Sequence, residues 1–399
     1  MWRNVASNAL TLFILALVVM SGMLTWLRQD YVNPGPLAQA ICFKVEKGAT
    51  ISVVSQGLAV QGAVAQASIF RLGAEYSGRG GKLKFGSYLI LPQASMEEIV
   101  ADLTSGGQST CGQDVNFRIG VAVAEVVLRK LDPVTNKYVE VVKFDPAAGV
   151  APAEYGAASA EPDLRWRVTL AEGVTSWQVV EALKAVDFLQ GEVKAVPLEG
   201  TLQPGSYEVE KGHDRAGLLA QMATNQAATL AELWATRAEG LPYKSPEDAL
   251  IMASIVEKET GVAAERKIVA SVFLNRIAAG MKLQTDPTVI YGVTKGQGVL
   301  GRGLRQSELR RDTPWNTYVR DGLPATPIAN PGRASIEAAL NPDSTKYLFF
   351  VADGTGGHAF AETLEQHNIN VAKWRAIEAG QGATETSGTG DATGSAPAP

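Results

Sequence analysis

Residues 9–27 of this chain carry no charged side chain and are rich in leucine. As an α-helix the run is roughly 28 Å long, which matches the hydrocarbon core of a bilayer. Trp26 lies at one end, where aromatic side chains favour the membrane interface. A cleaved signal peptide is the alternative, but bulky Met23 and Leu24 occupy the zone where small residues precede a cleavage site. We therefore expect residues 1–28 to be an uncleaved single-span anchor, with the bulk of the chain outside the cytoplasm.

Composition narrows the classes of partner. The net charge is -5, and no run of lysine and arginine occurs, which argues against a nucleic-acid partner. The two cysteines, Cys42 and Cys111, bracket residues 43–110. A disulfide in an oxidising compartment and a pair of free thiols both fit this spacing. Two cysteines are too few for a tetrahedral thiolate metal site, and we expect no metal and no cofactor.

An approximate internal repeat indicates an α+β fold. Each copy begins with a strand, a turn and a Thr-led helix, and later has a Gly-Ser-Tyr strand and a further helix. The first copy comprises Val45–Thr50, the apolar helical pattern after it, Lys84–Ile90 and Met96–Leu103; the second comprises Leu170–Thr175, Trp177–Val186, Gln203–Val209 and Arg215–Gln226. We predict two β-helix-helix-β-like units ahead of a mixed α/β catalytic domain.

The remaining segments separate these modules. Gln29–Gln39 reads as a linker, alternation within residues 113–144 predicts a hairpin with a turn at Asp132–Asn136, and residues 145–163 read as a loose loop. We predict no structure for the Gly/Ala/Thr/Ser/Pro tail. The predicted boundaries are 1–28 for the anchor, 40–107 for the first module, 108–164 for an inserted hairpin and loop, 165–240 for the second module, 241–379 for the catalytic domain and 380–399 for the tail.

A buried helix carries the candidate general acid. Ser245-Pro246-Glu247-Asp248 is typical of a helix start, and residues 249–256 are apolar almost all round. The helix should end near Gly261, and a second should run from 262 to 279 before Gly280. Glu257 and Glu259 fall on nearly opposite faces, and both have apolar neighbours. Such surroundings favour a protonated carboxyl group that can act as a general acid, although either residue could instead pair with Lys258, Arg266 or Arg276.

Amides, hydroxyls and an aromatic ring follow at loop positions. Such groups bind sugars, but Asn and Thr beside Pro and Gly also bond their own backbone. The candidates are Asn275, Gln284, Thr285, Asp286, Asn316, Thr317, Tyr318 and His358. Asp286 could be a second catalytic carboxylate, but Asp before Pro also fits a turn or helix cap. His358 and His367 show no zinc-ligand spacing, so hydrogen bonding is the better interpretation for both.

The ordered motifs from residue 253 to 368 resemble one family. They are Ala253–Thr260, Asn275-Arg276, Leu283–Gly292, Thr313–Tyr318, Gly322–Pro324, Ile328–Gly332, Tyr347–Val351, Gly356–Phe360 and His367-Asn368. Together they are similar to the MltG/YceG-like family of membrane-anchored endolytic murein transglycosylases. The resemblance implies cleavage of peptidoglycan strands to 1,6-anhydro-N-acetylmuramic acid ends. It also implies that Glu257, the first Glu of the motif, is catalytic, that Glu259 is structural and that the first module is LysM-like.

The resemblance further implies a single-pass inner-membrane protein whose catalytic domain lies in the periplasm, with wall-synthesis enzymes such as penicillin-binding proteins as partners. One block departs from the family. Leu198–Tyr207 lacks two aromatics and an Asp, which puts any glycan contacts there in doubt. Two alternatives stay open: a lysozyme-like muramidase that uses Asp286, and a non-catalytic glycan-binding anchor.

Overall fold

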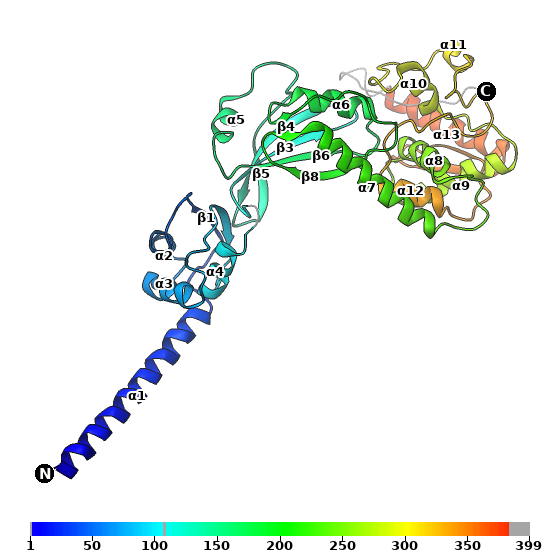
Figure 1. Ribbon diagram of the computed structural model, residues 1–399. Helices are drawn as coiled ribbons and strands as arrows, with labels where there is room; N and C mark the ends of the chain where they lie inside the picture. The colour runs from blue at the N-terminus through cyan, green and yellow to red at the C-terminus, as the bar shows by residue number, and fades with distance from the viewer. Residues whose placement is uncertain (1, 107–108, 383–399) are drawn as a thin grey trace. The chain divides into compact units, whose positions relative to one another are not determined.

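The computed structural model describes residues 2–106 and 109–382, a mixed α+β protein with one apolar N-terminal helix (Figure 1). The chain divides into two compact units. Unit 1 comprises Met1–Asn116, Val127–Phe144 and Val150–Trp166; unit 2 comprises Phe117–Val126, Asp145–Gly149 and Arg167–Pro399. The predicted fold class is confirmed at this level.

Helix α1 (Trp2–Val32) contains the predicted apolar run. Its stretch Ala9–Val32 is long and apolar enough to cross a membrane, and large side chains such as Leu12 and Phe13 are exposed around it. The helix continues past the predicted linker boundary to Val32. Pro34 then ends it, because proline disfavours a helical conformation in the residue before it.

The first module in unit 1 has the predicted order of elements. They are β1 (Ile41–Val45), α2 (Ile51–Val60), α3 (Ala67–Tyr76), β2 (Gly86–Ile90) and α4 (Met96–Thr104). Strands β1 and β2 pair antiparallel, with Ile41 opposite Ile90, and the three helices pack around a core that includes Leu58 and Phe70. Thr50 caps α2, and Ser95 with Glu98 forms a capping box on α4.

Cys42 of β1 and Cys111 form a disulfide, with their Cα atoms 5.6 Å apart. The bridge joins β1 to the chain segment that leaves the module. The sequence alone left this pairing open.

The segment after the module is more regular than predicted. The turn at 132–136 joins β4 (Ala124–Asp132) to β5 (Lys137–Phe144), and the Asp132 carboxylate accepts from the Val134 N–H and the Thr135 hydroxyl. The alternation from 115 to 119 belongs to a separate strand, β3 (Gln113–Ile119). Residues 145–163 include a short helix, α5 (Ala153–Ala158), because Tyr155 provides a buried anchor. The larger sheet has the strand order β5-β4-β3-β6-β8, in which β6 is Arg165–Leu170 and β8 is Gly205–Val209.

The second module in unit 2 repeats the first only partly. It contains β6 (Arg165–Leu170), α6 (Ser176–Ala185), β7 (Leu189–Gln190), β8 (Gly205–Val209), β9 (His213–Asp214) and α7 (Arg215–Ala235). Thr175 and Gln178 form a capping box at the start of α6. The expected second helix between α6 and β8 is absent from these described residues, which follow loops around β7 instead.

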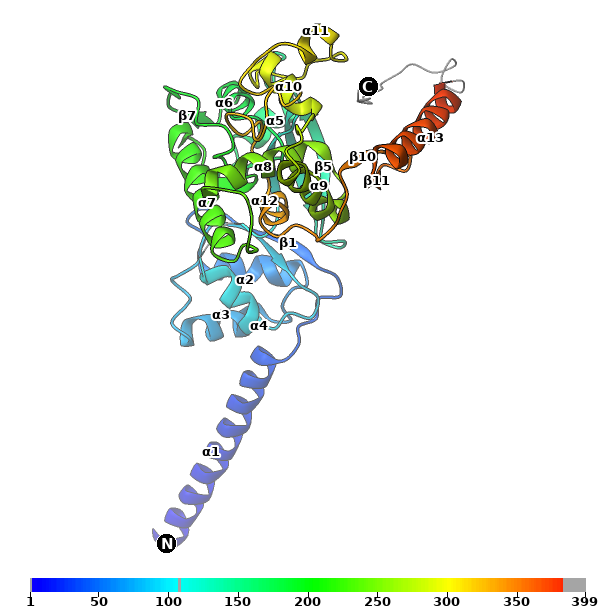
Figure 2. The same ribbon diagram turned by 90° about the vertical axis from the view of Figure 1, so that its right-hand side faces the viewer.

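The C-terminal part of unit 2 is built around one buried helix. Its elements are α8 (Pro246–Glu259), the 3-10 turn η1 (Ala263–Glu265), α9 (Arg266–Ala278), α10 (Asp286–Thr294), α11 (Gln306–Leu309), α12 (Arg333–Leu340), β10 (Phe349–Ala352), β11 (His358–Ala361) and α13 (Leu364–Gly382). All residues from Ala249 to Val256 are buried, and α8 packs against α9 and α12 (Figure 2). Helix α13 extends to Gly382, slightly into the predicted tail, and residues 383–399 lie outside the described residues.

Replacing both cysteines by serine should lower the free energy of unfolding of the first module. The bridge closes a loop with a sequence separation of 69 residues, so we expect a loss of about 2–4 kcal/mol from greater unfolded-state entropy. Chemical denaturation of the full-length protein in detergent, with and without a reductant, measures the effect. Equal stability of the oxidised wild type and the double variant would contradict it.

Candidate active site

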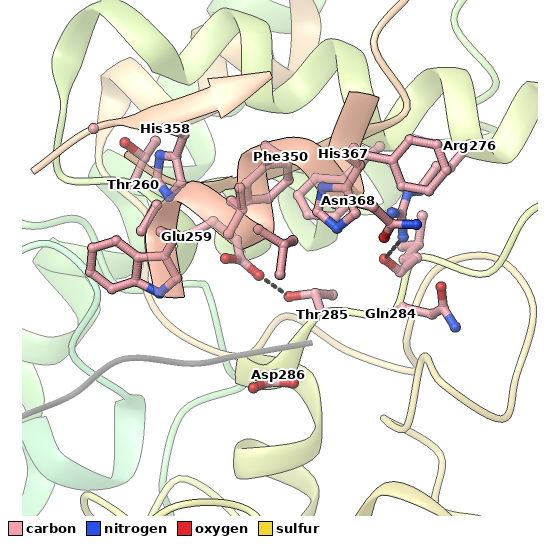
Figure 3. Close-up of a pocket in the computed structure, with 18 of the residues that line it drawn as sticks. Glu259, Thr260, Arg276, Gln284, Thr285, Asp286, Phe350, His358, His367 and Asn368 are labelled. Carbon is pink, nitrogen blue, oxygen red and sulfur yellow. Dashed lines mark hydrogen bonds between the residues drawn. The ribbon is translucent and has the colours of Figure 1, made fainter. Parts of the chain in front are cut away.

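A cavity of about 900 Å³ with both polar and apolar walls lies in unit 2 (Figure 3). Its walls come from the end of α8, from α9, from the segment 283–286, from the β10–β11 hairpin and from α13. The lining side chains able to contact a sugar are Glu259, Arg276, Gln284, Thr285, Asp286, Tyr318, His358, Asn368, Trp374 and Arg375. The cavity therefore combines carboxylates, amides and aromatic rings on one surface, as saccharide sites do.

Glu259 is the carboxylate that α8 delivers to this cavity. It is the last residue of the helix, and its side chain is only partly exposed. The Thr285 hydroxyl donates a hydrogen bond to its Oε1. Burial raises the pKa of Glu259 to about 7; Asp286 acts in the same direction, whereas the Thr285 hydrogen bond, His358 and Arg276 oppose it. Near neutral pH this group can exist in both protonation states, as a general acid that later acts as a base requires.

Glu257, which the resemblance marked as catalytic, does not line the cavity. Its Oε2 accepts a hydrogen bond from the Gly332 N–H at 3.0 Å. Two residues along a helix correspond to a rotation of about 200°, so Glu257 and Glu259 point to different sides of α8. On the Glu257 side lies Glu172, whose pKa is raised by burial and by the charge of Glu257. The structure thus places the two candidates of the motif in different environments.

The segment from Gln284 to Asp286 forms the part of the cavity wall next to the end of α8. Its backbone is fixed by Thr317, whose carbonyl accepts from the Gln284 N–H and whose hydroxyl accepts from the Thr285 N–H, each at 3.1 Å. Gln284 has a φ of 51°, in the left-handed region that a residue with a side chain rarely adopts. Its side chain is exposed to the cavity. Strain held by the surrounding structure at an exposed amide points to a functional position.

Asp286 begins α10, but Thr285, not Asp286, is the N-cap residue. The Tyr318 hydroxyl donates to the Asp286 carboxylate at 2.6 Å. Burial raises the pKa of Asp286, and the hydrogen bond from Tyr318 opposes that shift. Asp286 and Tyr318 therefore form a partly buried pair beside Glu259, instead of the turn or cap that was one alternative.

Three other candidates lie outside the cavity. The Asn275 amide donates to the Thr345 and Tyr347 carbonyls, both at 3.0 Å. Asn316 is buried and its amide donates to three carbonyls between residues 308 and 311, at 2.7–3.2 Å. Thr317 is buried between Thr285 and Thr288. These side chains fix loop backbone, which was the alternative interpretation for them.

Two residues that hold the cavity walls in place, Arg276 and Glu265, were not predicted from the sequence. Arg276 donates to the Leu348 carbonyl at 2.6 Å and to the Leu283 carbonyl at 2.8 Å, so it ties β10 to the segment before Gln284. Glu265 pairs with His358 Nδ1 at 2.7 Å. The motif did contain Asn275-Arg276, but which of two neighbouring polar residues contacts the cavity cannot be read from the pattern. Within the described residues, no group of three or more His, Cys, Asp or Glu could hold a metal ion.

The part of the chain that forms the cavity also matches a known protein family. The YceG-like family profile matches residues 43–141 and 147–373, which is well over half of the protein. This chain belongs to the YceG-like family. The match covers the first module from residue 43, the second module and all cavity-lining residues except Trp374 and Arg375.

Relatives of known name show the same similarity. A Bacillus subtilis protein named endolytic murein transglycosylase is 38% identical over 172 residues, 43% of this chain and 46% of its own length. A Streptococcus pneumoniae protein of the same name is 32% identical over 183 residues, 44% of this chain and 32% of its own length. The chain thus spans less than half the length of these relatives. A solved yceG-like protein from Listeria monocytogenes aligns with 83% of this chain and 99% of its own, at 26% identity and a TM-score of 0.44.

Stability measurements should separate the loop-fixing amides from the cavity amide. Asn316 is buried, and Asn316→Ala leaves the carbonyls of Glu308, Leu309 and Arg311 without their donor, so we expect a loss of about 2–3 kcal/mol. Gln284→Gly removes left-handed strain at an exposed position, and we expect no loss, or a gain of up to about 1 kcal/mol. Chemical denaturation monitored by tryptophan fluorescence compares them. A larger loss for Gln284→Gly than for Asn316→Ala would contradict the assignment.

Proposed function

We propose that this protein is a membrane-anchored endolytic murein transglycosylase with Glu259 as its acid and base. The observation that carries this proposal is the position of the Glu259 carboxyl group in the wall of a cavity of about 900 Å³, where burial raises its pKa to about 7. Membership of the YceG-like family and the names of the two relatives support the same reaction class. The assignment to Glu259 differs from the one that the sequence resemblance implied.

The proposed reaction uses one carboxyl group twice. Protonated Glu259 gives its proton to the oxygen of the scissile glycosidic bond, and the bond from that oxygen to C1 of N-acetylmuramic acid breaks. The resulting carboxylate then takes the proton of the C6 hydroxyl of the same sugar, and the C6 oxygen bonds to C1. The products are a free hydroxyl on the departing strand and a 1,6-anhydro end. Glu259 returns to its protonated state and no water is consumed.

The walls of the cavity suit this chemistry. Thr285 holds Glu259 through its hydroxyl, so the carboxyl group has a fixed orientation. Gln284 and Asn368 present amides that can bind acetamido or hydroxyl groups, and Tyr318 and Trp374 offer rings for apolar sugar faces. Asn275, Asn316 and Thr317 contribute by fixing the loops.

A hydrolase is the second candidate, because Asp286 supplies another carboxyl group in the same cavity. A muramidase would use it as the base or nucleophile that a hydrolytic mechanism needs. The raised pKa of Asp286, caused by burial, weakens this candidate because it disfavours the anion. The products decide, since hydrolysis leaves reducing ends and the transglycosylase leaves anhydro ends.

The anchor and the first module extend the proposal. Helix α1 would hold the protein in the inner membrane with unit 2 in the periplasm, where nascent strands emerge. A disulfide between Cys42 and Cys111 is consistent with that oxidising compartment. Residues 40–107 would serve as a LysM-like module that holds glycan, and cleavage would limit strand elongation by polymerases and penicillin-binding proteins. A purely glycan-binding role does not require a carboxyl group with a raised pKa in the cavity wall, whereas proton transfer does.

Two matched substitutions test the catalytic assignment. Glu259→Gln should lower cleavage of purified glycan strands at least about 100-fold, because the amide cannot transfer the proton. Glu257→Gln keeps an oxygen that accepts from Gly332 and should retain most of the activity. Mass spectrometry of the products of the full-length protein in detergent counts anhydro and reducing ends. Loss of activity in Glu257→Gln with an active Glu259→Gln would return the assignment to Glu257.

The pH dependence of cleavage should follow Glu259. The first step needs the protonated acid, so kcat/KM should fall as the pH rises above about 7. Asp286→Asn removes a neighbouring negative charge, lowers the pKa of Glu259 and should move this descending limb to lower pH. Thr285→Val removes a hydrogen bond to the carboxylate, raises the pKa of Glu259 and should move the limb to higher pH. Shifts in the same direction for both variants would exclude Glu259 as the titrating group.

A further inference from the structure

The β10–β11 hairpin presents His358 to the cavity in a defined position. The Asp353 carboxylate accepts from the Thr355 N–H and hydroxyl, each at 2.8 Å, and from the Gly357 N–H at 3.3 Å. These bonds close the turn between the strands. His358 then begins β11 opposite Ala352, and its ring lies edge-on to Phe350 at 5.2 Å between centroids. The ring therefore has little freedom to rotate.

Glu265, in the 3-10 turn η1 just before α9, also fixes His358. Its Oε1 accepts from the His358 N–H at 2.8 Å, and its Oε2 contacts His358 Nδ1 at 2.7 Å and accepts from the Thr260 hydroxyl at 3.2 Å. A Cβ at Gly357 would lie only 2.6 Å from Glu265 Oε1, so glycine there lets the carboxylate approach. The two side chains are 16% and 14% exposed. This is the arrangement in which a carboxylate orients an imidazole.

The pairing assigns the two ring nitrogens of His358. Because the Glu265 carboxylate accepts its other bonds, Nδ1 carries the proton that it donates to Oε2. With the proton on Nδ1, Nε2 is the acceptor of the ring, and none of the hydrogen bonds identified among the described residues uses it. The ring lines the cavity together with Glu259. An oriented acceptor thus lies in the cavity wall near the proposed acid.

The N-acetylmuramic acid ring at the scissile bond leaves one donor for this acceptor. Within an intact strand, N-acetylmuramic acid has an ether at C3 and a glycosidic bond at C4, so its ring offers only the C6 hydroxyl and the acetamido N–H as donors. The C6 hydroxyl must give its proton to Glu259. We propose that His358 Nε2 accepts a hydrogen bond from the acetamido N–H of the N-acetylmuramic acid residue at the scissile bond, an inference that rests on the proposed function.

The contact would fix the sugar in two ways. It sets the rotation of the sugar ring about the bond to be cleaved. The C6 hydroxyl is then held close to C1 and reacts there in preference to water. It also makes the site selective for the acetamido group, because a saccharide without that N–H would leave Nε2 unpaired. Glu265 acts through His358 and is a positioning residue, whereas His358 touches the substrate.

Two isosteric substitutions distinguish this role from a structural one. In His358→Asn the amide reaches the position of Nδ1 and can still bond Glu265, but nothing reaches the position of Nε2. In His358→Gln the amide reaches the position of Nε2. We expect His358→Asn to lower kcat/KM on N-acetylated strands about 10- to 100-fold, with a larger share of reducing ends. His358→Gln should keep more activity, and both variants should unfold near the wild-type temperature.

The second arm uses synthetic strands in which a 2-acetoxy group replaces the acetamido group of the muramic acid, so that the N–H is lost and the carbonyl is kept. The wild type should cleave them more slowly, and His358→Asn should then cost less than about threefold, because the two changes remove one shared interaction. Equal losses on both substrates would overturn the inference, as would a wild type indifferent to that replacement. If His358→Gln is as impaired as His358→Asn and both are destabilised, the residue is structural. Wild-type digests that contain only reducing ends would instead overturn the proposed function itself.

Discussion

The site depends on the burial of α8. Every residue from Ala249 to Val256 is buried, so neither the rotation nor the translation of this helix can change without disrupting the core of the C-terminal part of unit 2. Ser254 also bonds α8 to the loop at 328–332: its hydroxyl donates to the Ile251 carbonyl and accepts from the Ile328 N–H at 3.0 Å. The position of Glu259, at the last turn, is therefore set by apolar packing several residues earlier.

The rest of the cavity is held by side chains that bond backbone. Arg276, Asn275 and Thr317 each contact carbonyl or N–H groups of a loop, and Glu265 contacts the N–H of His358. Loops lack the regular backbone hydrogen bonds of a helix or a sheet, so polar side chains supply the partners of these groups. The cavity can then keep Gln284 in a strained backbone conformation, because its neighbours on both sides are fixed.

Much of the architecture could be predicted from the sequence, because capping residues and apolar periods are local signals. Thr50, Thr175 and Ser95 mark helix starts that the structure contains. The missing second helix of the repeat and the added helix α5 could not be predicted, since both depend on packing against other elements. The roles of the site residues were harder to predict than the helices and strands. Asn275, Asn316 and Gln284 are all amides within motifs. Only tertiary contacts show that Asn275 and Asn316 bond loop carbonyls, whereas Gln284 lines the cavity.

The Glu257 side of α8 is a junction between this helix, the loop at 328–332 and the second module. Glu257 bonds the Gly332 N–H, and a Cβ at Gly332 would overlap the Glu172 carboxylate, so this glycine lets two acidic groups approach one loop. Lys258 lies beside them; burial lowers its pKa, and the charges of Glu257 and Glu199 oppose that shift. Asn330 in the same loop donates to the Val174 carbonyl and accepts from the Leu202 N–H, both at 2.9 Å. Glu257 thus ties the end of α8 to the loop at 328–332, and Asn330 ties the same loop to the second module.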